Sequence, residues 1–196
     1  MQTLLPIDDV MPDVLDALKR TGRLVLQAPP GAGKTTRVPL AMLEAGLTQG
    51  RILMLEPRRL AARASAERMA QTLGEDVGQT VGYRVRGASA VTKATRIEVV
   101  TEGILTRMIQ DNPELPNVGA VIFDEFHERS LNADLGLALC LEIAGALRDD
   151  LLLVVMSATL DAGPVGVLMN APVVTSEGRS FPVTSHWLDK PLAKTV

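Results

Sequence analysis

The sequence predicts an α/β protein, a three-layer sandwich in which helices cover both faces of a mostly parallel sheet. Short aliphatic runs of strand length alternate with helical patterns along most of the 196 residues, as in βαβ units. Hydrophobic residues make up 46% of the chain and aromatic residues only 3%, so the core must be aliphatic, which suits strands buried on both faces. The length is enough for one domain, and no internal linker or repeat is visible, so we expect a single domain over residues 1–196.

The first half of the chain predicts three helices that alternate with two strands. Apolar residues of the first helix recur at helical spacing and share one face, and a glycine follows the end of that helix. Both strands are short apolar runs, and the first of them leads into a loop rich in proline and glycine. In order, these elements are helix 9–20, strand 23–28, helix 34–45, strand 51–56 and helix 58–73.

The second half continues the alternation with longer intervals. A short strand precedes two strand–helix repeats, which are followed by a further strand, and an Asp-Asn-Pro sequence ends the first helix of this half. The end of the chain is predicted to be extended and half-exposed. In order, these elements are strand 81–85, strand 96–101, helix 102–110, strand 120–124, helix 132–147, strand 151–156 and an extended tail over 173–188.

The charge balance and the single cysteine limit the classes of protein. The formal net charge is −3 and the isoelectric point about 5.4, so any contact with nucleic acid must come from local arginine clusters. Cys140 cannot form a disulfide within the chain and lies among apolar residues of a predicted helix, so we expect it in the core. The N-terminus lacks a signal-peptide pattern, and no run approaches the roughly 18 apolar residues of a membrane span. We therefore expect a cytoplasmic protein without a membrane partner.

A glycine-rich segment between the first strand and the second helix resembles the phosphate-binding P-loop, G-x-x-x-x-G-K-[ST]. Gly33, Lys34 and Thr35 match this pattern, and Ala28 stands in place of its first glycine. The glycines permit backbone angles that turn successive N–H groups inward, and the helix that follows adds its positive end. Lys34 would bind the β- and γ-phosphates of ATP, and Thr35 would bind Mg²⁺. The full set expected around the phosphates is Pro30, Gly31, Ala32, Gly33, Lys34, Thr35 and Thr36. The alternative is an ordinary glycine-rich turn with a solvated lysine.

Two carboxylates follow the apolar strand at 120–124. In P-loop ATPases an aspartate at this place holds Mg²⁺, usually through water, which is the role expected of Asp124. A glutamate beside it can orient and deprotonate the attacking water, which is the role expected of Glu125. A kinase acting on a small molecule would not need the second carboxylate, so the pair favours hydrolysis. The alternative is that the two acids cap the helix that follows.

The residues around this acidic pair resemble one family. Asp124-Glu125-Phe126-His127 is similar to the Asp-Glu-Ala-His box of the DEAH helicases, and the following Glu128-Arg129-Ser130-Leu131 is typical of the bacterial HrpB-type subgroup. The order of the shorter segments also matches that family, over residues 25–183. These segments are Pro57-Arg58-Arg59-Leu60-Ala61-Ala62, Gly82-Tyr83-Arg84-Val85-Arg86, Thr101-Glu102-Gly103 and Ser157-Ala158-Thr159.

The resemblance implies a RecA-like first motor domain of an ATP-dependent helicase. It implies that Arg68 lies under the adenine ring of ATP, and that His127, Ser157 and Thr159 couple the nucleotide site to the strand-binding face. It also implies a second RecA-like domain, normally in the same polypeptide, that supplies arginine fingers and without which this chain has little activity. The partner is single-stranded RNA or DNA, and the residues expected to face it are Arg58, Arg59, Arg84, Thr101, Glu102 and Gly103.

Structural alternatives remain open for these side chains. Arg58 and Arg59 begin a helix, where cations oppose the helix dipole at a cost of about 0.3–1 kcal/mol each, so they are either a phosphate site or solvated. Arg68 could likewise be solvated, Arg84 could belong to a polar sheet edge, and Thr101 could be an N-cap. His127 has no second His or Cys at ligand spacing, which argues against a structural zinc site.

Two other functions compete with the helicase hypothesis. A nucleotide or metabolite kinase would share the P-loop, but a basic lid segment and an acceptor pocket are not visible in the sequence. A binding module without catalysis would not need the complete set of Lys34, Thr35, Asp124 and Glu125.

Overall fold

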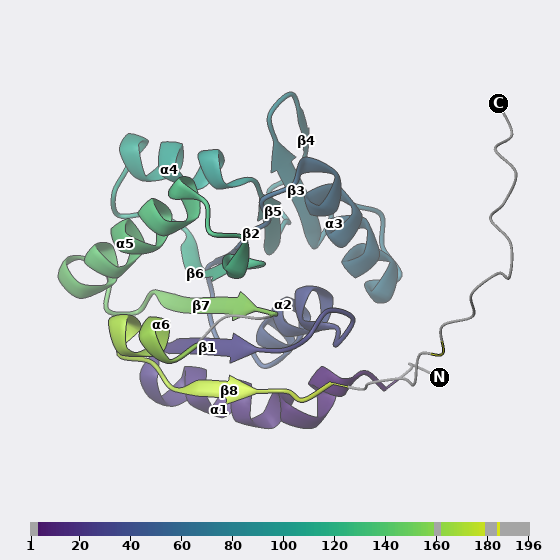
Figure 1. Ribbon diagram of the computed structural model, residues 1–196. Coiled ribbons are helices and arrows are strands. Elements are labelled where there is room, and N and C mark those ends of the chain that lie inside the picture. Colours follow the sequence, from purple (N-terminus) through teal and green to yellow (C-terminus); the bar gives the residue numbers. More distant parts are fainter. Residues whose placement is uncertain (1–3, 159–161, 179–183, 185–196) are drawn as a thin grey trace, which may run out of the picture.

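The computed structural model describes residues 4–158, 162–178 and 184. Eight strands form one sheet in the order β4-β3-β5-β2-β6-β7-β1-β8, and every neighbouring pair is parallel except the antiparallel hairpin of β3 and β4. The predicted α/β class with a mostly parallel sheet is confirmed (Figure 1). The strands are β1 Arg23–Gln27, β2 Arg51–Leu55, β3 Val81–Val85, β4 Ala88–Ala90, β5 Ile97–Val100, β6 Val118–Phe123, β7 Leu152–Ser157 and β8 Val173–Thr175.

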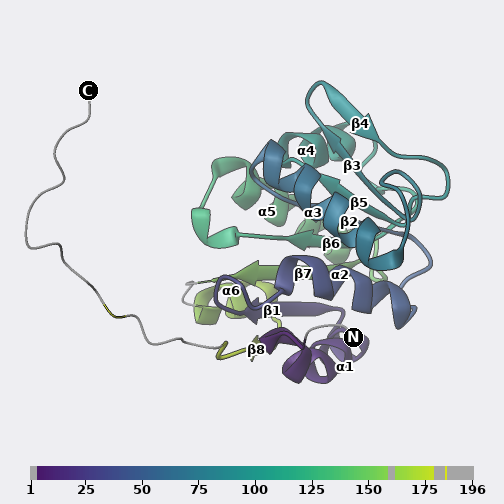
Figure 2. The ribbon, with the colours of Figure 1, turned by 90° about the vertical axis from the view of Figure 1, so that its right-hand side faces the viewer.

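Helices cover both faces of the sheet, with α1, α2 and α3 on one face and α4, α5 and α6 on the other (Figure 2). Two short 3₁₀ turns, η1 and η2, lie before α1 and after β6. The helical elements are η1 Pro6–Val10, α1 Met11–Thr21, α2 Lys34–Glu44, α3 Arg59–Leu73, α4 Glu102–Asp111, η2 Phe126–Glu128, α5 Leu131–Ala146 and α6 Ala162–Met169. Among the described residues, none of these helices is long and apolar enough to cross a membrane.

The central strands are buried on both faces, which explains their almost continuous apolar sequences. All six residues of β6 are buried, and successive side chains enter opposite cores: Ile122 faces α1 to α3, whereas Val121 and Phe123 face α4 to α6. Cys140 is fully buried in the second of these cores, as predicted. Each buried aliphatic side chain contributes about 1.5–3 kcal/mol.

Most predicted elements form within one or two residues of the expected bounds, and three were missed. The predicted helix 9–20 is a 3₁₀ turn followed by α1, which ends at Gly22 in the left-handed conformation. The sequence analysis did not predict β4, η2 or α6. Among the described residues of the expected extended tail, 173–178 and 184, only 173–175 form a strand. Residues 179–183 and 185–188 of that tail lie outside the described residues.

Candidate nucleotide-binding site

The predicted site residues meet at the carboxyl edge of the sheet. In the sheet β7 lies between β1 and β6, so the segments that follow these three strands are neighbours. The glycine-rich loop follows β1, Ser157 ends β7, and Asp124 follows β6. Parallel α/β sheets bind ligands at this edge, where the strand order reverses. The sheet topology therefore brings together segments about 90 residues apart in sequence.

The backbone of the glycine-rich loop has the shape predicted for a phosphate cradle. Gly31 and Gly33 have φ angles of 79° and 96°, in the left-handed region. A Cβ atom at Gly33 would lie 2.5 Å from the Leu5 side chain, so the backbone at this position packs closely against Leu5. The Ile7 N–H donates to the Ala32 carbonyl at 3.1 Å, which fixes the outer side of the loop. The loop then leads directly into α2, whose first N–H groups can face an anion.

Lys34 and Glu125 form an ion pair at the centre of the site. The Nζ atom of Lys34 lies 3.0 Å from Oε1 of Glu125, and the lysine side chain is only 4% exposed. Glu125 has φ 50° and ψ 35°, a left-handed conformation that is strained in residues other than glycine. The solvated-lysine alternative is wrong, because this ammonium group is buried against a carboxylate.

Asp124 is the most buried acid of the predicted site, at 4% exposure. Its Oδ1 accepts the Glu125 N–H at 2.8 Å, and its carboxylate is also hydrogen-bonded to the Thr35 side chain. Its Oδ2 is buried without a hydrogen-bond partner. Burial raises the pKa of Asp124 to about 6, against the opposing effects of Thr35 and the Lys34 charge. A buried unpaired carboxylate oxygen next to a hydroxyl is an oxygen donor set suited to Mg²⁺, so these residues fit the predicted metal.

Glu56 is a third buried carboxylate at this edge, and the sequence analysis gave it no role. It follows β2, is 3% exposed, and leaves its Oε1 without a hydrogen-bond partner. Burial, together with the nearby charge of Asp124, raises the pKa of Glu56 to about 7. The same signal that identified Asp124, an acid at the end of an apolar strand, was present at Glu56 in the sequence.

The turn after the acidic pair contacts the segment that follows β7. The Phe126 ring packs edge-on against Phe123, with centroids 6.2 Å apart, and so holds η2 against the core. The Ala158 N–H donates to Nδ1 of His127 at 3.4 Å, and the same nitrogen lies 3.4 Å from Oε2 of Glu125. Ser157 is fully buried at the end of β7. The remaining coupling residue, Thr159, lies outside the described residues.

The capping alternative is wrong for the acidic pair, whereas the predicted N-cap position of Thr101 is confirmed. Ser130 caps α5, accepting the Ala133 N–H at 2.9 Å, and neither acid makes a side-chain cap. Thr101 occupies the N-cap position of α4, but its side chain makes no capping hydrogen bond. The described residues contain no group of three or more His, Cys, Asp or Glu side chains placed to share a metal ion.

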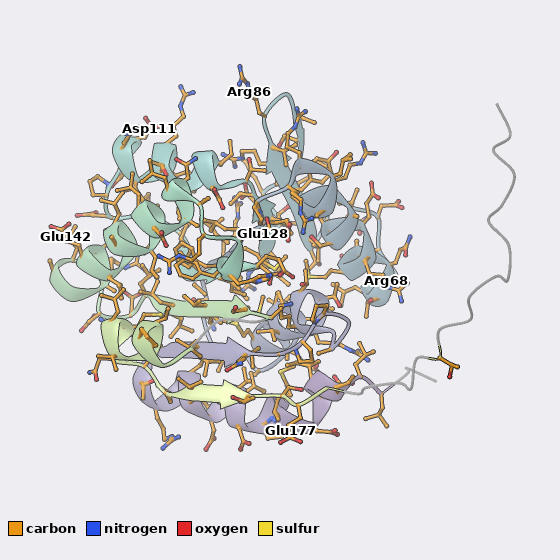
Figure 3. The ribbon with its side chains drawn as sticks, in the orientation of Figure 1. Arg68, Arg86, Asp111, Glu128, Glu142 and Glu177 are labelled. Atoms are coloured by element: carbon orange, nitrogen blue, oxygen red, sulfur yellow. The ribbon has the colours of Figure 1, made fainter. Side chains whose placement is uncertain are left out.

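The arginines predicted to face a nucleic-acid strand differ in their exposure and in their ion pairs. Arg58 and Arg59 are exposed at the start of α3, and Arg58 is paired with Glu128 at 2.9 Å. Arg68 is also exposed on α3, away from the sheet (Figure 3). Arg84 is held in the protein, because its Nε lies 2.9 Å from the fully buried Glu98. The sheet-edge alternative for Arg84 is wrong, because β3 lies between β4 and β5.

The segment Thr101-Glu102-Gly103 presents its residues in different ways. Gly103 is exposed and Thr101 is half-buried. The Glu102 carboxylate accepts a 2.5 Å hydrogen bond from the Ser130 hydroxyl. Glu102 is therefore occupied by an intramolecular contact, and its negative charge would repel a phosphate.

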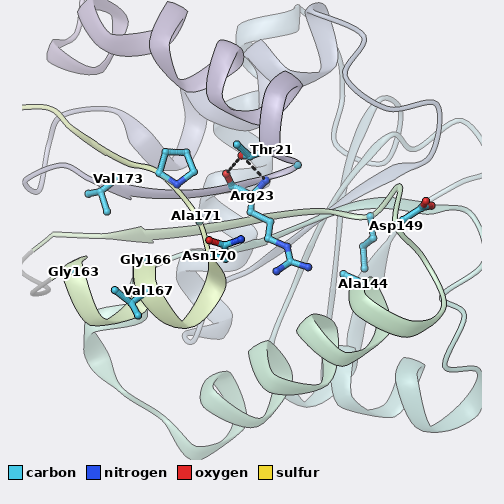
Figure 4. Close-up of a pocket in the computed structure, with 13 residues that line it drawn as sticks. Thr21, Arg23, Ala144, Asp149, Gly163, Gly166, Val167, Asn170, Ala171 and Val173 are labelled. Atoms are coloured by element: carbon cyan, nitrogen blue, oxygen red, sulfur yellow. Dashed lines mark hydrogen bonds between the residues drawn. The ribbon is translucent and has the colours of Figure 1, made fainter.

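A large cavity lies at the opposite edge of the sheet. Its volume is about 920 Å³, and Thr21, Arg23, Leu151 and Asn170 are among its lining residues (Figure 4). Thr21 donates to the Ala17 and Arg23 carbonyls, and Arg23 donates to the Met169 carbonyl at 3.0 Å. These polar groups hold chain segments together and do not converge on the cavity. The glycine-rich loop and the carboxylates at the other edge remain the candidate site.

Comparison with known proteins identifies the family of this chain. The family model of the DEAD/DEAH box helicases matches residues 9–165. The chain is 56% identical to the ATP-dependent RNA helicase HrpB of Escherichia coli over 188 residues, and 36% identical to the ATP-dependent RNA helicase HrpA of Borreliella burgdorferi over 181 residues. These matches cover 95% and 91% of this chain but only 23% and 22% of the relatives. The chain thus spans about a quarter of the length of the curated relatives it matches.

The structural comparison gives the same result. The crystal structure of the E. coli DEAH/RHA helicase HrpB matches with a TM-score of 0.87 and 57% identity, covering 91% of this chain and 23% of that one. A second crystal structure, of the E. coli DExH-box NTPase HrpB, matches with a TM-score of 0.88 and 56% identity. This chain belongs to the DEAD/DEAH box helicase family.

Proposed function

We propose that this chain is the ATP-binding motor domain of a nucleic-acid-dependent ATPase, and that the intact protein is an ATP-dependent RNA helicase. The relatives' names specify RNA, so single-stranded RNA is the proposed partner in preference to DNA. The single observation that carries the proposal is the contact of Lys34 with Glu125 beside the Asp124–Thr35 hydrogen bond. These four side chains are the parts that ATP hydrolysis at a P-loop requires.

The proposed chemistry is an in-line attack of water on the γ-phosphorus of ATP. Backbone N–H groups of residues 31–34 and the Lys34 ammonium bind the phosphates. Lys34 is paired with Glu125 in this structure and would pair with a phosphate oxygen when ATP binds. The Glu125 carboxylate would then be able to accept a proton from the attacking water. The bond from the γ-phosphorus to the bridging oxygen breaks, and ADP and phosphate leave. Magnesium, when bound by Thr35 and Asp124, would neutralise charge on the β- and γ-phosphates.

The other predicted roles are part of the same proposal. Arg68 would contact the adenine ring, and Thr159 would join His127 and Ser157 in coupling. A second RecA-like domain of the same polypeptide would supply the arginine fingers that complete the site. The segment carrying Arg58 and Arg59 would contact the phosphates of the strand, in a sequence-independent and salt-sensitive way. We also propose a cytoplasmic location, in keeping with a single, buried, unpaired cysteine.

Two substitutions test this function by separating ATP binding from hydrolysis. Lys34→Ala should abolish nucleotide binding measured by calorimetry, because it removes the charge that faces the phosphates. Glu125→Gln should retain binding and lose turnover, because an amide cannot accept the proton from water. Glu142→Gln, an exposed substitution on α5, is the matched control and should change neither quantity. Unchanged ATP affinity in Lys34→Ala, or undiminished hydrolysis in Glu125→Gln, would refute the assignment.

A further inference from the structure

The segment Glu125–Ser130, here called the acidic-box turn, contacts two of the three predicted strand-binding segments. It begins at Glu125, which is paired with Lys34, and contains the 3₁₀ turn η2. Two later residues of the segment, Glu128 and Ser130, make contacts that the proposed ATP chemistry does not use. One contact reaches the start of α3 and the other the start of α4. The turn that carries Glu125 is therefore tied directly to the elements expected to face a nucleic-acid strand.

The first contact occupies an arginine that is expected to bind phosphate. Nη2 of Arg58 lies 2.9 Å from Oε1 of Glu128, and the two side chains are 66% and 38% exposed. A guanidinium group binds carboxylates and phosphates through the same N–H donors. A strand phosphate that approaches Arg58 must therefore compete with the Glu128 carboxylate. Because the pair is at the surface, the phosphate can reach it.

The second contact fixes the far end of the acidic-box turn. The Ser130 hydroxyl donates to Glu102 at 2.5 Å and accepts the Ala133 N–H at 2.9 Å, so it joins the starts of α4 and α5. The Ser130 end of the turn is thus joined to α4, and the Glu128 side chain is joined to the start of α3 by one exposed ion pair. Arg129 follows Glu128 with φ 47°, a strained conformation that holds the turn in a sharp bend. Loss of the Arg58–Glu128 pair would remove this link to α3, three residues from Glu125, and leave the Phe126 packing in place.

We propose that Glu128 is a positioning residue that competes with strand phosphates for Arg58, so that strand binding breaks the link between the acidic-box turn and α3 and thereby promotes hydrolysis. The inference rests on the proposed function and adds to it a set of contacts through which strand binding at Arg58 affects hydrolysis at Glu125. A contact that strand binding must break lowers strand affinity. In the proposal, the same contact also restrains the turn that carries Glu125 while no strand is bound, and so slows basal hydrolysis. The effect of an exposed ion pair is modest, corresponding to about a two- to fivefold change in an equilibrium constant.

The test uses the intact protein that contains this chain and the variant Glu128→Gln, which keeps the size of the side chain and removes its charge. We expect its dissociation constant for single-stranded poly(U) RNA, measured by fluorescence anisotropy, to fall about two- to fivefold. We expect the strand-free ATP turnover number to rise by a similar factor, so the stimulation by RNA falls. Damage to the fold would weaken binding and slow turnover, which is the opposite pattern. Glu128→Asp, which retains the charge, should restore most of the wild-type behaviour.

Asp134→Asn is the matched control for this experiment. Asp134 forms a 3.0 Å pair with Arg129, and its side chain is 38% exposed, as is that of Glu128, but the pair does not reach α3. This variant should keep the wild-type RNA affinity and stimulation. If the wild-type protein is stimulated by RNA and Glu128→Gln is unchanged or binds RNA more weakly, the competition is refuted while the proposed function stands. If the wild-type protein shows no RNA-stimulated hydrolysis, the proposed function fails and the competition fails with it.

Discussion

Replacing Glu56 by glutamine should stabilise this chain at pH 8 and have little effect at pH 4.5. Glu56 is buried beside Asp124, and its pKa is raised from 4.5 to about 7 in the folded protein. The folded state therefore holds a proton more tightly than the unfolded state does. For the wild type, the free energy of unfolding should fall as the pH rises from 4.5 to 7, and this contribution should be constant above pH 7. Glutamine cannot ionise, so Glu56→Gln removes this loss of unfolding free energy.

The magnitude follows from the difference between the two pKa values. At 1.36 kcal/mol per pH unit, the rise from 4.5 to about 7 corresponds to a loss of about 3 kcal/mol by pH 8. In a domain of this size, 1 kcal/mol shifts the melting temperature by about 2–4 °C, so Glu56→Gln should gain roughly 6–12 °C at pH 8. Glutamine keeps a side-chain oxygen that can accept the Arg58 N–H, as the glutamate does, so this hydrogen bond is retained.

Urea unfolding at several pH values, with EDTA to remove divalent metal, measures this difference directly. Asp124 titrates in both proteins, so the difference between the two curves reports Glu56 together with its charge interaction with Asp124. Glu142→Gln, at an exposed position, should show no pH-dependent gain. If Glu56→Gln is no more stable than the wild type at pH 8, or gains equally at pH 4.5, the reasoning about a buried ionised carboxylate is wrong.

Two further predictions concern the phosphate loop and the core. The free energy of unfolding in urea should be at least about 1 kcal/mol lower for Gly33→Ala than for Gly31→Ala. Both positions have positive φ, but only a Cβ at Gly33 would clash with Leu5. Equal stability of the two variants would contradict the packing argument. Burial raises the pKa of Cys140 to about 12, so the native thiol should react with a thiol reagent at pH 8 roughly a thousandfold more slowly than in urea. Labelling of the native protein at the unfolded rate would show that Cys140 is not in the core.

The sequence predicted the elements whose patterns are long or apolar. Strand β3 was predicted at residues 81–85, as observed, and the strands around the site were found because both of their faces are buried. By contrast, β4 has only three residues, Ala88-Ser89-Ala90, and is formed by pairing with β3. Helix α6 contains two glycines and a proline and depends on packing against β1 and β8. Tertiary contacts outweigh local propensity in both cases.

The candidate site shows the same division between what is local in sequence and what is not. The glycine-rich loop and the acidic pair follow from short motifs in sequence order. The Lys34–Glu125 pair joins residues 91 positions apart, and it depends on the strand order in the sheet. Arg84 was expected to face nucleic acid, but Arg51 and Arg84 together neutralise the buried Glu98. A buried acid within an apolar strand is the only signal in the sequence that could have suggested this.

The phosphate loop and Asp124 are the centre of this account, and a bound nucleotide tests them most directly. The measurement is a crystal structure of this chain with magnesium and a non-hydrolysable ATP analogue. We expect the phosphates against the N–H groups of residues 31–34, and the Nζ atom of Lys34 moved from Glu125 to a phosphate oxygen. A structure in which the analogue binds elsewhere, or in which Lys34 remains on Glu125 beside an occupied loop, would contradict the account.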